Sequence, residues 1–254
     1  MSGHSKWHTI KHKKGALDAK RGKAFTRIIK ELTVAARSGG GDPGMNPRLR
    51  TIIADAKANN MPRENIERAI RRGTGEEPGV SYEEITYEGY GPGGVALLIE
   101  SLTDNKNRTV GEIRFMLTKY NGNLAAENSV AWMFSRKGQV VVEKAASEKA
   151  GADEETLLNA ALEAGADDMN DDGSVWEIVC PPEVFEAVRD AVKALGVEPA
   201  GAEVAMLPKN FIKLQGKEAQ QMLKLFEAID DHDDVQHVWA NFDIEEKEIE
   251  ASLA

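Results

Sequence analysis

The sequence GTGEEPG at residues 73–79 separates two chemically different parts of this chain. Residues 1–72 hold 17 Lys and Arg against 6 Asp and Glu, a net charge of +11. The whole chain carries −10, so residues 73–254 carry −21. Glycine and proline favour a linker here, and the apolar pattern changes from helical before it to strand-like after it. We therefore predict a basic helical domain joined to an acidic α+β region.

Three predicted helices precede this linker. Apolar residues recur at helical spacing within residues 16–38, and the glycines that follow end this first helix. Asn46 and Pro47 are typical of an N-cap and the first helical residue after it, and Pro62 opens a third helix that ends near Arg72. Three helices with short breaks predict a small helical bundle.

The first helix also carries a basic stripe. On a helical wheel these cations lie opposite the apolar face, where we expect them to be solvated: Lys20, Lys23, Arg27, Lys30 and Arg37. Ahead of the helix, residues 1–14 form an arm with four lysines, three histidines and no acid, which is too polar to fold alone. Trp7 in this arm could dock on the rest of the protein or stack on a base, and both alternatives stay open.

Strand patterns follow the linker. Residues 83–88 and 95–100, with a glycine-rich turn between them, predict a hairpin. We expect Asn107 to cap the next helix and residues 130–134 to form a third strand. Within residues 139–207 the order strand, helix, strand, strand, helix, strand is that of a ferredoxin-like unit. A helix and a strand within residues 217–244 can complete the sheet that the hairpin begins.

The predicted fold class is α+β: an N-terminal three-helix bundle domain, then two ferredoxin-like α+β domains, the third inserted into the second. The basic helical domain with its arm is predicted to span residues 1–79. The discontinuous α+β domain comprises residues 80–136 plus 208–254, and the inserted domain comprises residues 137–207. The longest apolar run is too short to cross a membrane and no secretory signal is evident, so we expect a cytoplasmic protein without a membrane partner.

The sequence contains no clear catalytic motif. The turn at residues 89–94 matches the dinucleotide pattern G-x-G-x-x-G, but a strand follows it where that pattern needs a helix. Cys180 lies in an apolar run and is predicted to be a core thiol. Residues 230–234 with His237 are the best metal candidate, although a solvated acidic loop is the preferred interpretation. The polar residues 104–108 are expected to cap a helix, with a contact to RNA or a partner as the alternative. We expect no enzyme activity, metal, cofactor or small-molecule substrate.

The charge asymmetry predicts a polyanionic partner at the N-terminal end, most simply nucleic acid. The residues predicted to bind it are the cations of the arm and first helix with two rings from the arm: Lys6, Trp7, Lys11, His12, Lys13, Lys14, Lys20, Arg21, Lys23, Arg27 and Lys30. Phosphate contacts of this kind do not distinguish DNA from structured RNA.

Several motifs resemble those of the YebC family and follow one another along nearly the whole chain. They are GHSKW (3–7), KRGK (20–23), GGGDP (39–43), NPRLR (46–50), NNMP (59–62), YEGYGPGG (87–94), TDNKNRT (103–109) and DDVQ (233–236). The resemblance implies an N-terminal helical domain and two α+β domains, one inserted in the other. Family members are described as probable transcriptional regulators that bind DNA. Mitochondrial relatives are described as translational activators of a cytochrome c oxidase subunit, and bacterial relatives are linked to ribosomes stalled at proline runs.

The resulting prediction is a non-enzymatic nucleic-acid-binding regulator of gene expression, and the resemblance favours a DNA-binding transcriptional regulator. One alternative is a ribosome-associated translation factor that binds ribosomal or transfer RNA. A metal-dependent enzyme that uses residues 230–234 is a less favoured alternative. The last is a protein-interaction module whose basic arm docks on its own acidic body.

Overall fold

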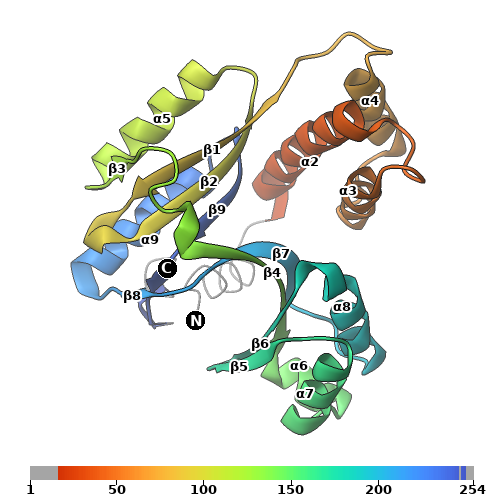
Figure 1. Cartoon of the computed structure of the whole chain (residues 1–254), viewed down its shortest axis with the longest axis vertical. Coiled ribbons are helices and arrows are strands. Elements are labelled where there is room, and N and C mark those ends of the chain that lie inside the picture. Colours follow the sequence, from red (N-terminus) through yellow and green to blue (C-terminus); the bar gives the residue numbers. More distant parts are fainter. Residues whose placement is uncertain (1–16, 246, 250–254) are drawn as a thin grey trace.

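The computed structural model describes residues 17–245 and 247–249, with side chains described from residue 22 onward. Within this range a helical bundle and two four-stranded sheets form three groups around a common centre (Figure 1). The bundle contains α2 (Leu17–Gly39), α3 (Pro47–Ala58) and α4 (Arg63–Thr74).

Local signals and close packing together set the bundle's geometry. The Asn46 side chain accepts a hydrogen bond from the Leu49 amide at 3.1 Å, which caps α3 as predicted. The apolar stripes of the three helices meet in one core that includes Leu32, Leu49 and Ile66. A Cβ on Gly73 would lie 2.4 Å from the Thr33 carbonyl oxygen, so glycine permits α4 to approach α2 closely. The helix therefore extends into the predicted linker.

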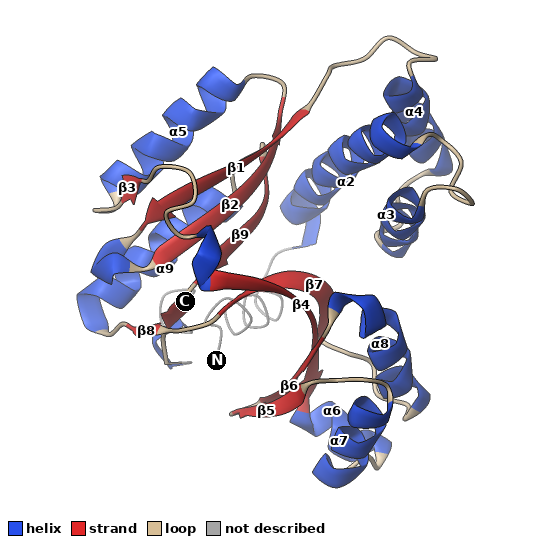
Figure 2. Ribbon diagram, in the orientation of Figure 1, coloured by secondary structure: helices blue, strands red, loops and turns tan. Residues whose placement is uncertain are grey.

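The first sheet has the strand order β3-β1-β2-β9, and every neighbouring pair is antiparallel. Helices α5 and α9 cover one face, where Ile113 and Phe226 pack against Leu97 and Val238. Figure 2 shows α2 on the opposite side of this sheet from α5. The elements of this region are β1 (Glu83–Tyr90), η1 (Pro92–Gly94), β2 (Ala96–Thr103), α5 (Lys106–Lys119), β3 (Asn123–Leu124), β8 (Ile212–Lys213), α9 (Gly216–Asp230), β9 (Val235–Ala240) and β10 (Phe242–Asp243).

The second sheet has the antiparallel order β5-β6-β4-β7, which is the strand order of a ferredoxin-like unit. Helices α7 and α8 pack on one face through residues such as Leu157 and Val188. Its elements are η2 (Ala131–Met133), β4 (Phe134–Glu143), α6 (Lys144–Ala150), α7 (Glu154–Glu163), β5 (Asp168–Asp172), β6 (Val175–Cys180), η3 (Pro182–Val184), α8 (Phe185–Ala194) and β7 (Gly201–Pro208).

The predicted fold class is confirmed, since the strands of the second sheet lie between β3 and β9 along the chain. We propose three domains, at residues 1–79, 80–136 plus 208–254, and 137–207. Strand β4 begins three residues before the last of these ranges and β7 ends one residue after it. A smaller apolar cluster joins the two sheets and includes Leu98, Trp239, Phe134 and Ala205.

Two local predictions were wrong, and one short helix was missed. Residues 130–134 do not form a separate strand, because the buried Glu88 carboxylate accepts the backbone N–H groups of Asn128, Val130 and Ala131 at 2.6–2.9 Å. Those groups are therefore not available to a strand ladder, and β4 begins only at Phe134. Helix α5 is capped by Asn105 rather than by Asn107. The pattern also missed α6, which is only seven residues long.

Candidate functional site: the basic helix and an acidic segment

The basic face of α2 lies against the turn between α9 and β9. We call residues 230–234, which are the last residue of α9 and this turn, the acidic segment. Lys23, Arg27 and Lys30 share one helix face because they are four and three residues apart. Lys23 Nζ lies 3.0 Å from the Asp231 carbonyl oxygen and 3.5 Å from its carboxylate. The Arg27 guanidinium donates to the Asp230 carbonyl oxygen and lies 3.6 Å from the Asp230 carboxylate.

Lys30 makes the most buried of these contacts. Its ammonium lies 2.7 Å from Asp234 Oδ1, 2.8 Å from the Asp233 carbonyl oxygen and 3.3 Å from the Leu102 carbonyl oxygen. The residue is only 7% exposed. The expectation of a solvated face is therefore wrong for Lys30, because an element from the far end of the chain covers it.

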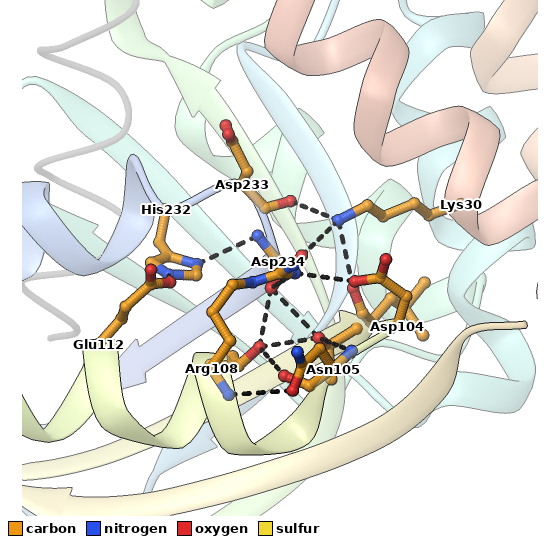
Figure 3. A network of polar contacts seen from close by, with 11 residues as sticks. Lys30, Asp104, Asn105, Arg108, Glu112, His232, Asp233 and Asp234 are labelled. Atoms are coloured by element: carbon orange, nitrogen blue, oxygen red, sulfur yellow. Dashed lines mark hydrogen bonds and ion pairs between the residues drawn. The ribbon is translucent and has the colours of Figure 1, made fainter. Parts of the chain in front are cut away.

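Asp234 is the centre of the network shown in Figure 3. Its second oxygen, Oδ2, lies 2.7 Å from Arg108 Nη2, 2.7 Å from Thr109 Oγ1 and 3.2 Å from Thr103 Oγ1. Burial opposes the charged form, yet hydrogen bonds from Arg108, Lys30 and Thr109 hold the pKa of this carboxyl well below its usual range. The buried carboxylate is thus ionised at neutral pH and bonded from two parts of the fold.

Residues of the first sheet hold the acidic segment in place independently of α2. The Leu102 amide donates to the Asp234 carbonyl oxygen at 2.8 Å, which fixes the segment at the end of β2. The Asp234 amide donates to His232 Nδ1 at 3.1 Å. The other ring nitrogen, Nε2, then carries the proton and donates to Glu112 on α5 at 2.8 Å.

The structure describes the side chains of only some of the predicted binding residues. Lys23, Arg27 and Lys30 come together on the acidic segment. The side chains of Lys20 and Arg21 lie outside the described part, although their backbone belongs to α2. The remaining residues lie entirely outside the described range: Lys6, Trp7, Lys11, His12, Lys13 and Lys14.

The part of this network contributed by residues 104–108 was predicted mainly to cap a helix, not to join the acidic segment. Asn105 does cap α5, in line with the expected capping role of residues 104–108, but Arg108 reaches beyond the cap to Asp234. It also bonds to Asp104 at 2.8 Å. The available signal was a polar segment after β2 and an acidic one before β9, since β2 and β9 pair in the first sheet. Within residues 17–245 and 247–249, no group of three or more His, Cys, Asp or Glu side chains is arranged to hold a metal ion.

A second polar cluster lies where α2 faces the first sheet. Glu31 Oε1 is 3.9 Å from His237 Nε2, and the His237 ring stacks on Trp239 with centroids 5.2 Å apart. Burial raises the pKa of Glu31 to about 7 and lowers the pKa of His237 to about 4. Burial also raises the pKa of Glu100 in β2. Near neutral pH the imidazole is therefore uncharged while Glu31 titrates.

Other predicted features have clear positions. Cys180 is buried in the core of the second sheet, as expected, and burial raises the pKa of its thiol. Helices α3 and α4 carry further exposed cations, among them Arg50, Lys57, Arg68 and Arg72. None of the described helices is both long and apolar enough to cross a membrane.

Comparison with known proteins identifies the family from both ends of the chain. Residues 5–76 match the TACO1/YebC protein N-terminal domain, and residues 82–242 match the TACO1/YebC second and third domain. The chain belongs to the TACO1/YebC family. Within it, a probable transcriptional regulatory protein of Koribacter versatilis is 59% identical over 98% of both chains. Another, from Acidobacterium capsulatum, is 60% identical over 98% of both chains.

A solved structure supports the same assignment. The crystal structure of a conserved hypothetical protein from Aquifex aeolicus is similar to this chain, with a TM-score of 0.77 and 44% identity. The similarity covers 90% of this chain and 92% of that one. The TACO1/YebC fold therefore extends over the helical bundle and both sheets.

Proposed function

We propose that this protein is a regulator of gene expression that binds nucleic acid and catalyses no reaction. The observation that carries the proposal is the charge separation, +11 in residues 1–72 against −21 in residues 73–254. Basic residues gathered at one end attract a polyanion, while the acidic remainder repels phosphate and orients the protein on it. The names of the relatives, probable transcriptional regulatory proteins, support a regulatory role.

The proposed contact surface is the arm with the basic face of α2. It consists of Lys6, Trp7, Lys11, His12, Lys13, Lys14, Lys20, Arg21, Lys23, Arg27 and Lys30. The exposed cations of α3 and α4 extend this charge over the rest of the bundle. Side chains of this kind bind phosphates and set the position of the protein on the nucleic acid without reading bases.

DNA is the favoured partner because of the names of the relatives. Structured RNA, including ribosomal RNA, is the second candidate, since a basic bundle that reads shape suits RNA at least as well. We propose a cytoplasmic location, as the sequence predicts. A non-catalytic role is supported by the acidic segment, whose buried carboxylate at Asp234 is bonded to Arg108 and Lys30.

Fluorescence anisotropy with labelled duplex DNA of two unrelated sequences and a labelled RNA hairpin tests the proposal. The variant replaces the four arm lysines, Lys6, Lys11, Lys13 and Lys14, by Gln. Its matched control replaces four exposed lysines of the acidic region by Gln: Lys106, Lys119, Lys213 and Lys217. Both variants lose the same charge, so only local phosphate contact separates them.

We expect the arm variant to bind more weakly and with a smaller salt dependence, by about 0.9 in log–log slope for each lost contact on duplex DNA. The control should bind like the wild type. Equal weakening of both variants would show that only net charge matters. Failure of every form of the protein to bind DNA or RNA at low salt would refute the proposed function. The ratio of the two affinities decides between DNA and RNA.

A further inference from the structure

We propose that the acidic segment mimics a nucleic-acid backbone and occupies the basic face of α2, so that nucleic acid binds there only after displacing it. This inference rests on the proposed function and adds a self-inhibiting state to it. The basic face is therefore covered by residues 230–234 of the same chain.

The contacts resemble those that a phosphate strand would make. Lys23, Arg27 and Lys30 span about 10 Å along the helix axis. Each of them contacts oxygen atoms of the acidic segment, which presents both carbonyl and carboxylate oxygens to the helix. A row of negatively polarised oxygens opposite a row of cations is also the pattern of a protein–phosphate interface.

The two partners exclude each other at Lys30. A phosphate cannot reach an ammonium that is 7% exposed and already lies 2.7 Å from a carboxylate oxygen. Binding at this face therefore needs an open state in which α2 has left the acidic segment. The apparent dissociation constant then equals the intrinsic one divided by the open fraction.

The construction of the network favours reversible exchange. When α2 leaves, Asp234 keeps its hydrogen bonds to Arg108, Thr103 and Thr109, so its charge is not left without a partner. Lys30 exchanges one anionic oxygen for another when it binds phosphate. Residues 75–82, between α4 and β1, form the connection about which the bundle would move.

The test compares three full-length variants with the wild type, using the labelled duplex and RNA hairpin over a range of salt concentrations. Asp234→Asn removes the central carboxylate. Asp231→Asn removes the half-exposed partner of Lys23. Asp233→Asn is the matched control, because it removes the same charge from the same segment while only the Asp233 carbonyl oxygen contacts Lys30; in Figure 3 its carboxylate points away from the network.

We expect Asp234→Asn to raise affinity by roughly tenfold, within the range of about 5- to 150-fold usual for coupled sites. Its salt dependence on duplex DNA should steepen by up to about 3 units of log–log slope, because three further cations become available to phosphate. Asp231→Asn should show a smaller increase, and Asp233→Asn should bind like the wild type.

Each outcome decides the inference. Wild-type binding that neither Asp234→Asn nor Asp231→Asn strengthens would overturn the mimicry and leave the proposed function standing. An equal gain in all three variants would overturn it too, by showing a net-charge effect. If Asp234→Asn or Asp231→Asn binds nucleic acid and the wild type does not, the mimicry is strongly supported. If no form binds, both proposals are overturned. If Asp234→Asn does not fold, Asp231→Asn decides.

Discussion

Replacing Lys30 by Met should destabilise the protein through the buried network alone. Methionine retains the apolar stem of lysine but removes the ammonium that contacts Asp234, Asp233 and Leu102. A hydrogen bond to a charged group contributes about 1.5–3 kcal/mol. Leaving a buried charge entirely without its partner costs about 3–5 kcal/mol. Because Arg108 stays bonded to Asp234, the smaller of these two costs applies, and we expect the free energy of unfolding to fall by about 2 kcal/mol.

Urea denaturation followed by two spectroscopic probes measures this change, since agreement of the probes establishes a two-state transition. Lys23→Met is the matched control: its ammonium is half exposed, so the loss should stay within about 0.5 kcal/mol. The Asp234 carboxylate has a folded pKa below the unfolded value of 3.8, so its contribution is present above that value and is lost only as pH falls through the folded one. The deficit of Lys30→Met should therefore be the same at neutral and mildly acidic pH. A deficit no larger than that of Lys23→Met would refute the reasoning.

Four further predictions concern single positions. Glu88→Gln should lower the melting temperature at neutral pH, and the deficit should shrink in acid, because hydrogen bonding lowers the pKa of Glu88 and its contribution is lost as pH falls through that value. Glu31→Gln should stabilise the protein by roughly 1–2 kcal/mol above about pH 7. The pKa of Glu31 is raised from 4.5 to about 7 in the folded protein, so ionisation of this carboxyl destabilises the fold as pH rises through that interval. Urea midpoints measured across pH should therefore show no gain below pH 4.5. Gly73→Ala should lose about 1–3 kcal/mol through its clash with the Thr33 carbonyl. By contrast, Gly111→Ala at an exposed position of α5, with nothing within 4 Å of the added Cβ, should gain about 0.5–1 kcal/mol in the same urea assay.

Much of the fold was predictable because its signals are local. The spacing of Ile28, Leu32 and their neighbours determined α2, and Asn46 with Pro47 determined the start of α3. Strand and helix patterns in residues 139–207 predicted the ferredoxin-like order of the second sheet. The wrong strand at residues 130–134 had a non-local cause, since Glu88, about 40 residues earlier, takes the backbone donors of this stretch.

The candidate site likewise has features that local sequence signals predicted and features that depend on contacts between distant parts of the chain. Sequence periodicity was enough to place Lys23, Arg27 and Lys30 on one face of α2 and to set them opposite its apolar face. The residue types also singled out a polar segment, residues 104–108, and an acidic one, residues 230–234, and the family motifs at residues 103–109 and 233–236 overlap them. Periodicity did not show that Arg108 and Asp234, one from each motif, would meet Lys30, because a helical wheel separates two faces of one helix without showing what covers either.

By itself, then, the sequence determined the charge asymmetry, the helices, most of the strands and the basic face of α2. These depend on spacing and composition within a few turns of chain. Only the tertiary structure decided that this face is occupied, because Lys30 and Asp234 are 204 residues apart. Pairing of β2 with β9 carries Asp234 to the end of the first sheet, where Lys30 of the bundle contacts it. An ion pair between residues so distant in sequence produces no periodic pattern in either segment.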